Sequence, residues 1–181
     1  MIEVRFHGRG GQGAVTAAMI LSVAGFKDGK FTQAFPKFGV ERRGAPVEAF
    51  TRISDSFIRR KSAVYEPNYL VVLDSTLFSA VDITSGFQKD GMIIVNTNKS
   101  AKELGLPDGL NLKTLDVSGL AMEMLGRDIV NTAMLGAFAG FTGLVSLEGL
   151  YKGIDDHFSG SLAEKNKKLL DKVYSLAREQ K

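Results

Sequence analysis

"IEVRFHGRGGQGAVTAAMIL", residues 2–21, is the stretch that decides the fold. Its first five residues, with apolar side chains at Ile2, Val4 and Phe6, are typical of a short strand. Residues from Gln12 to about Phe26 carry the crowded Ala, Val, Met, Ile and Leu of a packed helix. A glycine-rich turn at 8–13 separates the two segments. Strand, glycine turn and helix in this order predict the first unit of an α/β fold.

Two apolar runs further along the chain predict buried parallel strands. They are "YLVVLD" at 69–74 and "GMIIVNT" at 91–97, and both are continuous rather than alternating. A parallel strand that is covered on both faces has this pattern. Residues 75–88 lie between the two runs, and we expect a crossover helix there.

Three weaker strand signals and a helical end complete the predicted architecture. The strands are expected at 31–35, at 46–54 and within 113–119, and helices from near Leu120 onward. We therefore expect an α/β fold with a Rossmann-like, mostly parallel sheet flanked by helices and a helical C-terminal third. Residues 1–181 are expected to form a single domain.

The last helix has the clearest local pattern. Ser161 followed three residues later by Glu164 predicts a capping box. An apolar stripe follows, consisting of Leu162, Leu169, Leu170, Val173 and Ala177. Asn166 falls within that stripe, so we expect its amide to find hydrogen-bond partners in the interior, or else to lie at the edge of the stripe.

Composition excludes several kinds of chemistry. The chain of 181 residues has no cysteine, so it cannot supply a disulfide, a thiol nucleophile or a thiolate-held metal or iron–sulfur centre. It has two histidines and neither the H-E-x-x-H nor the G-x-S-x-G motif. We expect His7 to be structural, and we assign no catalytic residue and no metal ligand to this chain.

Charge and hydropathy point away from nucleic acid and membrane. The net charge is +3, which is small for a nucleic-acid footprint. The longest apolar stretch, 133–145, is too short to span a bilayer. The start imitates a secretory signal, but Glu3 and the glycine turn argue against one. We expect a cytoplasmic chain.

The glycine turn is the first candidate site. Gly8, Gly10 and Gly13 fit G-x-G-x-x-G between a strand and a helix. Glycines let backbone amides approach an anion closely, and the helix N-terminus adds partial positive charge. Alternatively, the glycines only let the first helix pack tightly on the sheet.

Two familiar uses of such a loop fit poorly. A dinucleotide site needs an acidic residue at the end of the second strand, whereas residues 34–36 are Ala, Phe and Pro. The Walker loop needs Lys and Ser or Thr after its last glycine, but Ala14 and Val15 follow Gly13. The loop therefore favours a phosphate ligand other than a nicotinamide dinucleotide or ATP.

The second candidate is the stretch at residues 35–54, whose loop runs from the end of one predicted strand back into another. It is broken by glycine and proline, and it carries Lys37, Arg42 and Arg43. Paired guanidinium groups suit a carboxylate or a phosphate, and Phe35 and Phe38 add apolar surface. Alternatively, this is a solvated basic surface without a ligand.

Five blocks of sequence together resemble the gamma subunit of pyruvate and related 2-oxoacid:ferredoxin or flavodoxin oxidoreductases. They are "HGRGGQGAVTAAMIL", "QAFPKFGVERRGAP", "IRRKSAVYEPNYLVVLD", "VNT" at 95–97 and "NTAMLG" at 131–136. Their order and spacing extend over nearly the whole chain. Ala133 stands where proline is common in the family, and "AEKNKKLL" matches its last helix only loosely.

The resemblance implies a subunit of an enzyme that oxidatively decarboxylates a 2-oxoacid, with pyruvate as the first expectation, to acyl-coenzyme A and reduces ferredoxin or flavodoxin. Thiamine diphosphate and the iron–sulfur clusters are expected on partner subunits, and the chain alone is expected to be inactive. Coenzyme A is the expected co-substrate, and the residues expected to contact it are Gly8, Arg9, Gly10, Gly11, Gln12, Gly13, Lys37, Arg42 and Arg43. Two alternatives remain: an assembly subunit whose loops only contact partners, and a free-standing nucleotide- or phosphate-binding module.

Overall fold

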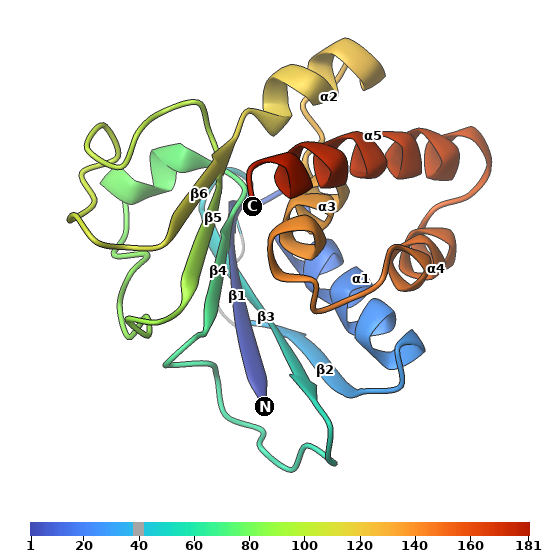
Figure 1. Cartoon of the computed structure of the whole chain (residues 1–181), viewed down its shortest axis with the longest axis horizontal. Coiled ribbons are helices and arrows are strands. Elements are labelled where there is room, and N and C mark those ends of the chain that lie inside the picture. Colours follow the sequence, from blue (N-terminus) through green and yellow to red (C-terminus); the bar gives the residue numbers. More distant parts are fainter. Residues whose placement is uncertain (38–41) are drawn as a thin grey trace.

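The computed structural model describes residues 1–37 and 42–181, and within them it shows a six-stranded sheet (Figure 1). The strand order is β2-β3-β1-β4-β5-β6. The strands are β1 (Ile2–Arg9), β2 (Phe31–Pro36), β3 (Pro46–Ser54), β4 (Tyr69–Val72), β5 (Met92–Asn96) and β6 (Leu112–Leu115). Strands β1, β4, β5 and β6 pair in parallel, and β3 runs antiparallel to both β1 and β2. The predicted mostly parallel sheet is confirmed.

The helices gather mainly on one side of this sheet. They are α1 (Ala14–Lys27), α2 (Val117–Leu125), α3 (Asn131–Thr142), α4 (Leu147–His157) and α5 (Gly160–Glu179), with a short 3-10 helix η1 (Ser75–Ser79). Figure 1 shows α1, α3, α4 and α5 together against one face. Four of the helices follow residue 116, which confirms the helical C-terminal third.

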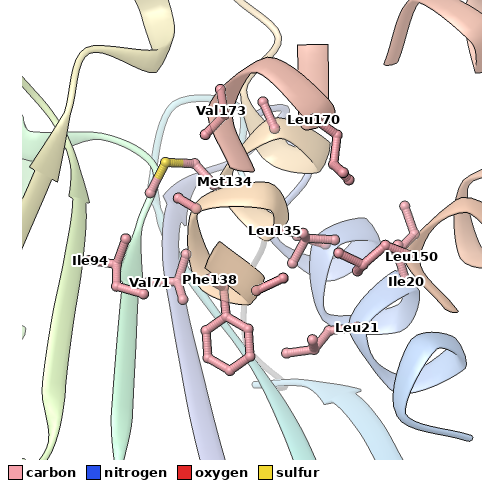
Figure 2. Packing of buried hydrophobic residues seen from close by; sticks show 14 of the residues in the cluster. Ile20, Leu21, Val71, Ile94, Met134, Leu135, Phe138, Leu150, Leu170 and Val173 are labelled. Atoms are coloured by element: carbon pink, nitrogen blue, oxygen red, sulfur yellow. The ribbon is translucent and has the colours of Figure 1, made fainter. Parts of the chain in front are cut away.

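The main core lies between the sheet and these helices. Helix α3 is buried along almost its whole length, and Figure 2 shows Met134, Leu135 and Phe138 between the strands and the neighbouring helices. Its glycines permit this because a Cβ on Gly140 would lie 2.6 Å from the Cβ of Ala177 in α5. The apolar run at 133–145 is therefore the central helix of the core. No helix of the described chain is long and apolar enough to cross a membrane.

The other face of the sheet is covered by irregular chain rather than by the predicted crossover helix. Leu70 and Val72 of β4 pack there with Leu77 and Ile83. The expectation of a helix over 75–88 is wrong, because only η1 forms. The carboxylate of Asp82 accepts a hydrogen bond from the Thr84 amide at 3.1 Å, and Gly86 has a φ of 70°. A side chain that accepts a hydrogen bond from a nearby backbone amide interrupts the hydrogen bonding of a helix. A residue in the left-handed conformation does the same.

The start of α5 also differs from the prediction, whereas its buried asparagine agrees with it. The N-cap is Ser159, which forms no side-chain cap bond, and Gly160 begins the helix with a φ of 57°. The capping box expected at Ser161 is therefore wrong. Asn166 is buried; its Oδ1 accepts from Thr132 Oγ1 at 2.6 Å and its Nδ2 donates to the Leu162 carbonyl at 2.8 Å. The amide thus joins α5 to α3.

Candidate functional site

The two candidate loops meet at the carboxyl end of β1. The Gly10 amide donates to the Ala45 carbonyl at 2.8 Å, and the Gly44 amide donates to the Gly10 carbonyl at 3.1 Å. Gly10 and Arg43 form an isolated parallel bridge. Segments that lie more than thirty residues apart in the chain therefore build one surface.

Gly10 is needed for this contact between the two loops. A Cβ built on Gly10 would collide with the Arg42 carbonyl oxygen and would lie 3.1 Å from the Arg42 carbonyl carbon. The space beside Gly10 is therefore filled by the backbone of the second loop. Gly10 thus has a packing role, and its contact with a ligand stays a prediction.

The other glycines of the turn divide between packing and open space. Gly13 is the N-cap of α1 with a φ of 79°, and a Cβ there would lie 2.5 Å from Asn131 Nδ2 at the start of α3. A Cβ on Gly8 would lie 3.2 Å from a methyl group of Leu73. Gly11 has a φ of 96°, and no described atom lies within 4 Å of its Cβ position. Gly11 is therefore the glycine of the turn with room beside it.

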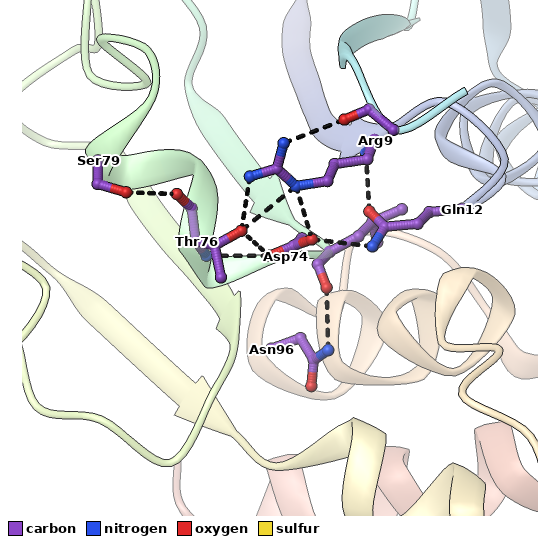
Figure 3. A network of polar contacts seen from close by, with 8 residues as sticks. Arg9, Gln12, Asp74, Thr76, Ser79 and Asn96 are labelled. Atoms are coloured by element: carbon purple, nitrogen blue, oxygen red, sulfur yellow. Dashed lines mark hydrogen bonds and ion pairs between the residues drawn. The ribbon is translucent and has the colours of Figure 1, made fainter. Parts of the chain in front are cut away.

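Arg9 and Gln12 are held in a polar network around Asp74, which Figure 3 shows. The Arg9 guanidinium lies 3.1 Å from Asp74 Oδ2 and donates to Thr76 Oγ1 at 2.8 Å and to the Gly44 carbonyl at 3.0 Å. Gln12 donates to Asp74 Oδ2 at 3.0 Å, and its own oxygen accepts from the Arg9 amide at 2.7 Å. Both side chains, which we expected at the ligand, bind Asp74 at the start of η1, and Arg9 also joins the glycine turn to the second loop.

Asp74 is ionised in this network. Burial raises the pKa of its carboxyl group, but hydrogen bonds from Thr76 and Gln12 and the charge of Arg9 outweigh burial and hold the pKa below its usual range. The carboxylate is thus an anchor for the loop's donors.

Arg42 and Arg43 are the candidate residues that point to solvent. Both are exposed, and neither forms an ion pair within the described chain. With Gly10 and Gly11 they line a surface hollow of about 340 Å³. Lys37, by contrast, is paired with Glu48 at 3.0 Å. Residues 38–41, including the Phe38 of the predicted loop, lie outside the described residues.

His7 is structural. Its side chain is buried, and its Nε2 accepts a hydrogen bond from Arg5 Nε at 3.0 Å. Burial, with the nearby charges of Arg5 and Lys37, lowers the pKa of His7 to about 3. The imidazole is therefore neutral near pH 7.

A second hollow, lined mainly by polar residues, lies beside the network and was missed from the sequence. Its volume is about 160 Å³, and its lining residues are Gln12, Leu73, Asp74, Ser75, Asn96, Ser118 and Asp128. Asn96 anchors it, donating to the Leu73 carbonyl at 2.9 Å and accepting from the Val117 and Ser118 amides at 3.0 Å each. The available signal was that Asp74 and Asn96 directly follow the apolar residues of two predicted parallel strands. The carboxyl ends of parallel strands lie at the same edge of a sheet, where ligands bind.

The position of the second hollow follows from the topology. In the strand order, the connection from β1 to β2 runs toward one edge of the sheet, and the connection from β4 to β5 runs toward the opposite edge. The crevice between β1 and β4 is thus a topological switch point, where open α/β sheets bind ligands. Within the described residues, no group of three or more His, Cys, Asp or Glu side chains could hold a metal ion.

Comparison with known proteins identifies close relatives. Residues 3–176 match the family described as pyruvate ferredoxin/flavodoxin oxidoreductase. The pyruvate synthase subunit PorC of Methanocaldococcus jannaschii is 55% identical, over 97% of this chain and 96% of that protein. The common subunit gamma of the pyruvate/ketoisovalerate oxidoreductases of Thermococcus kodakarensis is 55% identical, with the same two coverages.

Solved structures agree with the sequence relatives. The crystal structure of pyruvate oxidoreductase subunit PORC from Thermotoga maritima superposes with a TM-score of 0.82 at 38% identity, covering 96% of this chain and 95% of that one. The 2-oxoglutarate:ferredoxin oxidoreductase from Magnetococcus marinus, solved with 2-oxoglutarate, coenzyme A and succinyl-CoA bound, shares the fold at 18% identity and a TM-score of 0.76. That match covers 98% of this chain and 31% of the longer one.

Proposed function

Because this chain belongs to the pyruvate ferredoxin/flavodoxin oxidoreductase family as a gamma-type subunit, we propose that its paired loops bind coenzyme A within the assembled enzyme. In this proposal the complex decarboxylates a 2-oxoacid, with pyruvate as the first candidate, forms acyl-coenzyme A and reduces ferredoxin or flavodoxin. Companion subunits carry the thiamine diphosphate and the iron–sulfur clusters. The absence of cysteine from this chain supports that division, since thiolates hold such clusters.

The observation that carries the proposal is the hollow at the junction of the two loops. Arg42 and Arg43 flank it with two exposed guanidinium groups, and Gly11 leaves one wall open. Forked guanidinium donors match the oxygens of phosphate groups, which coenzyme A carries on its nucleotide end. The N-terminus of α1, capped by Gly13 with no side-chain hydrogen bond, adds positive partial charge two residues beyond Gly11.

The same geometry disfavours a nicotinamide dinucleotide. Strand β2 ends at Pro36 and supplies no acidic side chain for ribose hydroxyls. The nearest acid of the network, Asp74, is already bonded to Arg9, Gln12 and Thr76. Coenzyme A bound to the Magnetococcus neighbour is consistent with the proposed ligand class.

In this proposal the chain binds and orients the co-substrate and does no bond-breaking chemistry. His7 is buried and neutral, and Arg9 holds the loop rather than the reacting groups. The fixed network keeps the backbone of Gly10 and Gly44 in register, so that Arg42 and Arg43 stand at a defined edge of the hollow. Decarboxylation and electron transfer belong to the companion subunits.

A second candidate is a loop pair that contacts only partner subunits. The exposure of Arg42 and Arg43 favours it equally, because a guanidinium pair also binds the carboxylates of a protein. A direct titration separates the two functions: coenzyme A is titrated calorimetrically into the purified chain and into the complex.

The titration uses three forms of the protein. They are the wild type, Arg42→Ala with Arg43→Ala, and the control Arg178→Ala, which removes an exposed arginine at the end of α5. Coenzyme A binding is expected to weaken at least tenfold in the double variant and to stay unchanged in the control. Unchanged binding in the double variant, with a loss of assembly instead, would establish the second candidate.

A further inference from the structure

A strap of irregular chain at the other end of the sheet has no part in the proposed site. This strap, residues 55–68, joins β3 to β4 and contains the "IRRKSAVY" stretch noted in the sequence. Figure 1 shows it beside the N-terminus of β1, whereas the glycine turn follows the opposite end. β1 has eight residues, so the two ends lie about 25 Å apart.

The strap is fixed to the sheet by a buried arginine. Arg52 of β3 has no exposed side-chain surface, and it pairs with Glu3 at 2.7 Å. Its guanidinium also donates to strap carbonyls, at 3.2 Å to Arg60, 2.7 Å to Ser62 and 3.3 Å to Ala63. Hydrogen bonds from a charged donor are stronger than neutral ones, so these three bonds fix the strap to the sheet.

Further bonds hold the two ends of the strap. Gln33 donates to the Ile58 carbonyl at 3.2 Å. Asn68 and Glu3 exchange hydrogen bonds of 2.8 and 2.9 Å at the other end. The side chains of Ile58 and Val64 are buried beneath it. The strap is therefore a built surface rather than a loose connection.

This fixed strap presents aromatic and cationic side chains to solvent. Phe57 is 70% exposed and packs edge-to-face on Phe31, which is 46% exposed on the edge strand β2, with ring centroids 6.0 Å apart. Arg59, Arg60 and Lys61 follow the buried Ile58, and all three are exposed. Residues 57–65 include no acid, and within the described chain Arg59 and Lys61 form no ion pair. Arg60 lies 3.7 Å from Glu3.

From these observations we propose that the strap docks an acidic, partly apolar segment of a companion subunit of the oxidoreductase. Exposed aromatic side chains next to exposed cations are typical of interface anchors, and the positive charge of Arg59 and Lys61 favours a partner rich in Asp and Glu. The proposal rests on the subunit nature of the chain and is independent of coenzyme A binding, because the two surfaces lie at opposite ends of β1.

The first test is assembly. The affinity of the chain for the remaining purified subunits is measured for the wild type, for Arg59→Glu with Lys61→Glu, and for Phe57→Ala. Arg60 stays unchanged because it contacts Glu3. Lys168→Glu with Lys172→Glu, on the exposed surface of α5, is the matched charge-reversal control.

The strap charge reversal is expected to weaken assembly at least tenfold, and Phe57→Ala several-fold, with the melting temperature of the chain unchanged. The wild-type affinity is expected to fall as salt is raised, and the charge-reversed variant is expected to lose most of that dependence. At subunit concentrations high enough to reassemble the complex with the strap variants, the KM for coenzyme A is expected to equal the wild-type value. Failure of the docking proposal therefore leaves the coenzyme A proposal unaffected. Wild-type assembly of the strap variants, or an equal loss in the α5 control, would overturn the docking proposal.

The second test identifies the chemistry of the partner. A zero-length carbodiimide joins a lysine amine only to a carboxylate in direct contact. Mass spectrometry of the crosslinked complex is expected to find Lys61 joined to an Asp or Glu of a companion subunit. A crosslink from Lys61 only to a second copy of this chain, or only within this chain, contradicts the proposal.

Discussion

His7 gives the chain a pH dependence that follows from its burial. The imidazole is buried and accepts a hydrogen bond from Arg5. Its pKa is lowered from 6.5 to about 3. In the unfolded chain the same group has its ordinary pKa of 6.5. The neutral form is therefore favoured by folding, so its contribution to stability is complete above pH 6.5 and is lost as the pH falls from 6.5 toward 3.

The size of this loss at pH 5.0 depends little on the precise folded pKa. At that pH the unfolded histidine is almost fully protonated, and the folded one is not. Linkage then gives a loss of about 2 kcal/mol in the free energy of unfolding relative to pH 7.5. Carboxyl groups add their own pH dependence, so the quantity to compare is a difference between two proteins.

Urea unfolding of the purified chain at pH 7.5 and pH 5.0 measures that difference. In His7→Gln the amide oxygen can still accept from Arg5, but the titrating group is gone. Wild type is expected to lose about 2 kcal/mol more than His7→Gln between the two pH values. His157→Gln, at an exposed position in α4, keeps His7 and should lose as much as wild type. An equal loss in wild type and His7→Gln would refute the assignment of His7 as a buried neutral group.

Three further predictions concern packing and the division of labour. Gly10→Ala should lower the free energy of unfolding by roughly 1–3 kcal/mol, because the methyl group meets the Arg42 carbonyl, and urea unfolding that matches wild type would count against this packing. Asn166→Ala should lower the free energy of unfolding by about 1–3 kcal/mol, because the buried Thr132 hydroxyl loses its acceptor. Adding Thr132→Val to that variant removes the unpaired hydroxyl, and thermal melts should then show part of the stability regained. The isolated chain should be colourless and should reduce no electron acceptor with any 2-oxoacid, so measurable reduction by the pure subunit would contradict placing the reaction centres on other subunits.

The sequence predicted the elements whose residues lie close together in the chain. The strand, turn and helix at 2–26 and the two apolar strands at 69–74 and 91–97 came from periodicity and glycine placement, and the structure contains all of them. The segment at 75–88 failed because its apolar residues imitate a helix, whereas Asp82 and Gly86 impose turns.

For the candidate site, the sequence did not predict how the two loops pack against each other. The sequence indicated both loops, but it had no signal that Gly10 would bond to Ala45, because that contact depends on the antiparallel pairing of β1 and β3. For the same reason the sequence did not indicate that Arg9 pairs with Asp74, sixty-five residues away. Long-range partners of a polar side chain are fixed by topology, which single-sequence patterns do not contain.

The most direct test of the central claim is the kinetics of the assembled enzyme with altered loop arginines. The complex is reconstituted with Arg42→Ala and Arg43→Ala, and the KM for coenzyme A and kcat are measured at saturating 2-oxoacid and acceptor, with Arg178→Ala as the control. If the loop pair binds coenzyme A, its KM should rise at least tenfold while kcat at saturating coenzyme A stays within about twofold, because a binding contact is lost without loss of the reaction centre. A fully assembled double variant with wild-type KM for coenzyme A would contradict the claim.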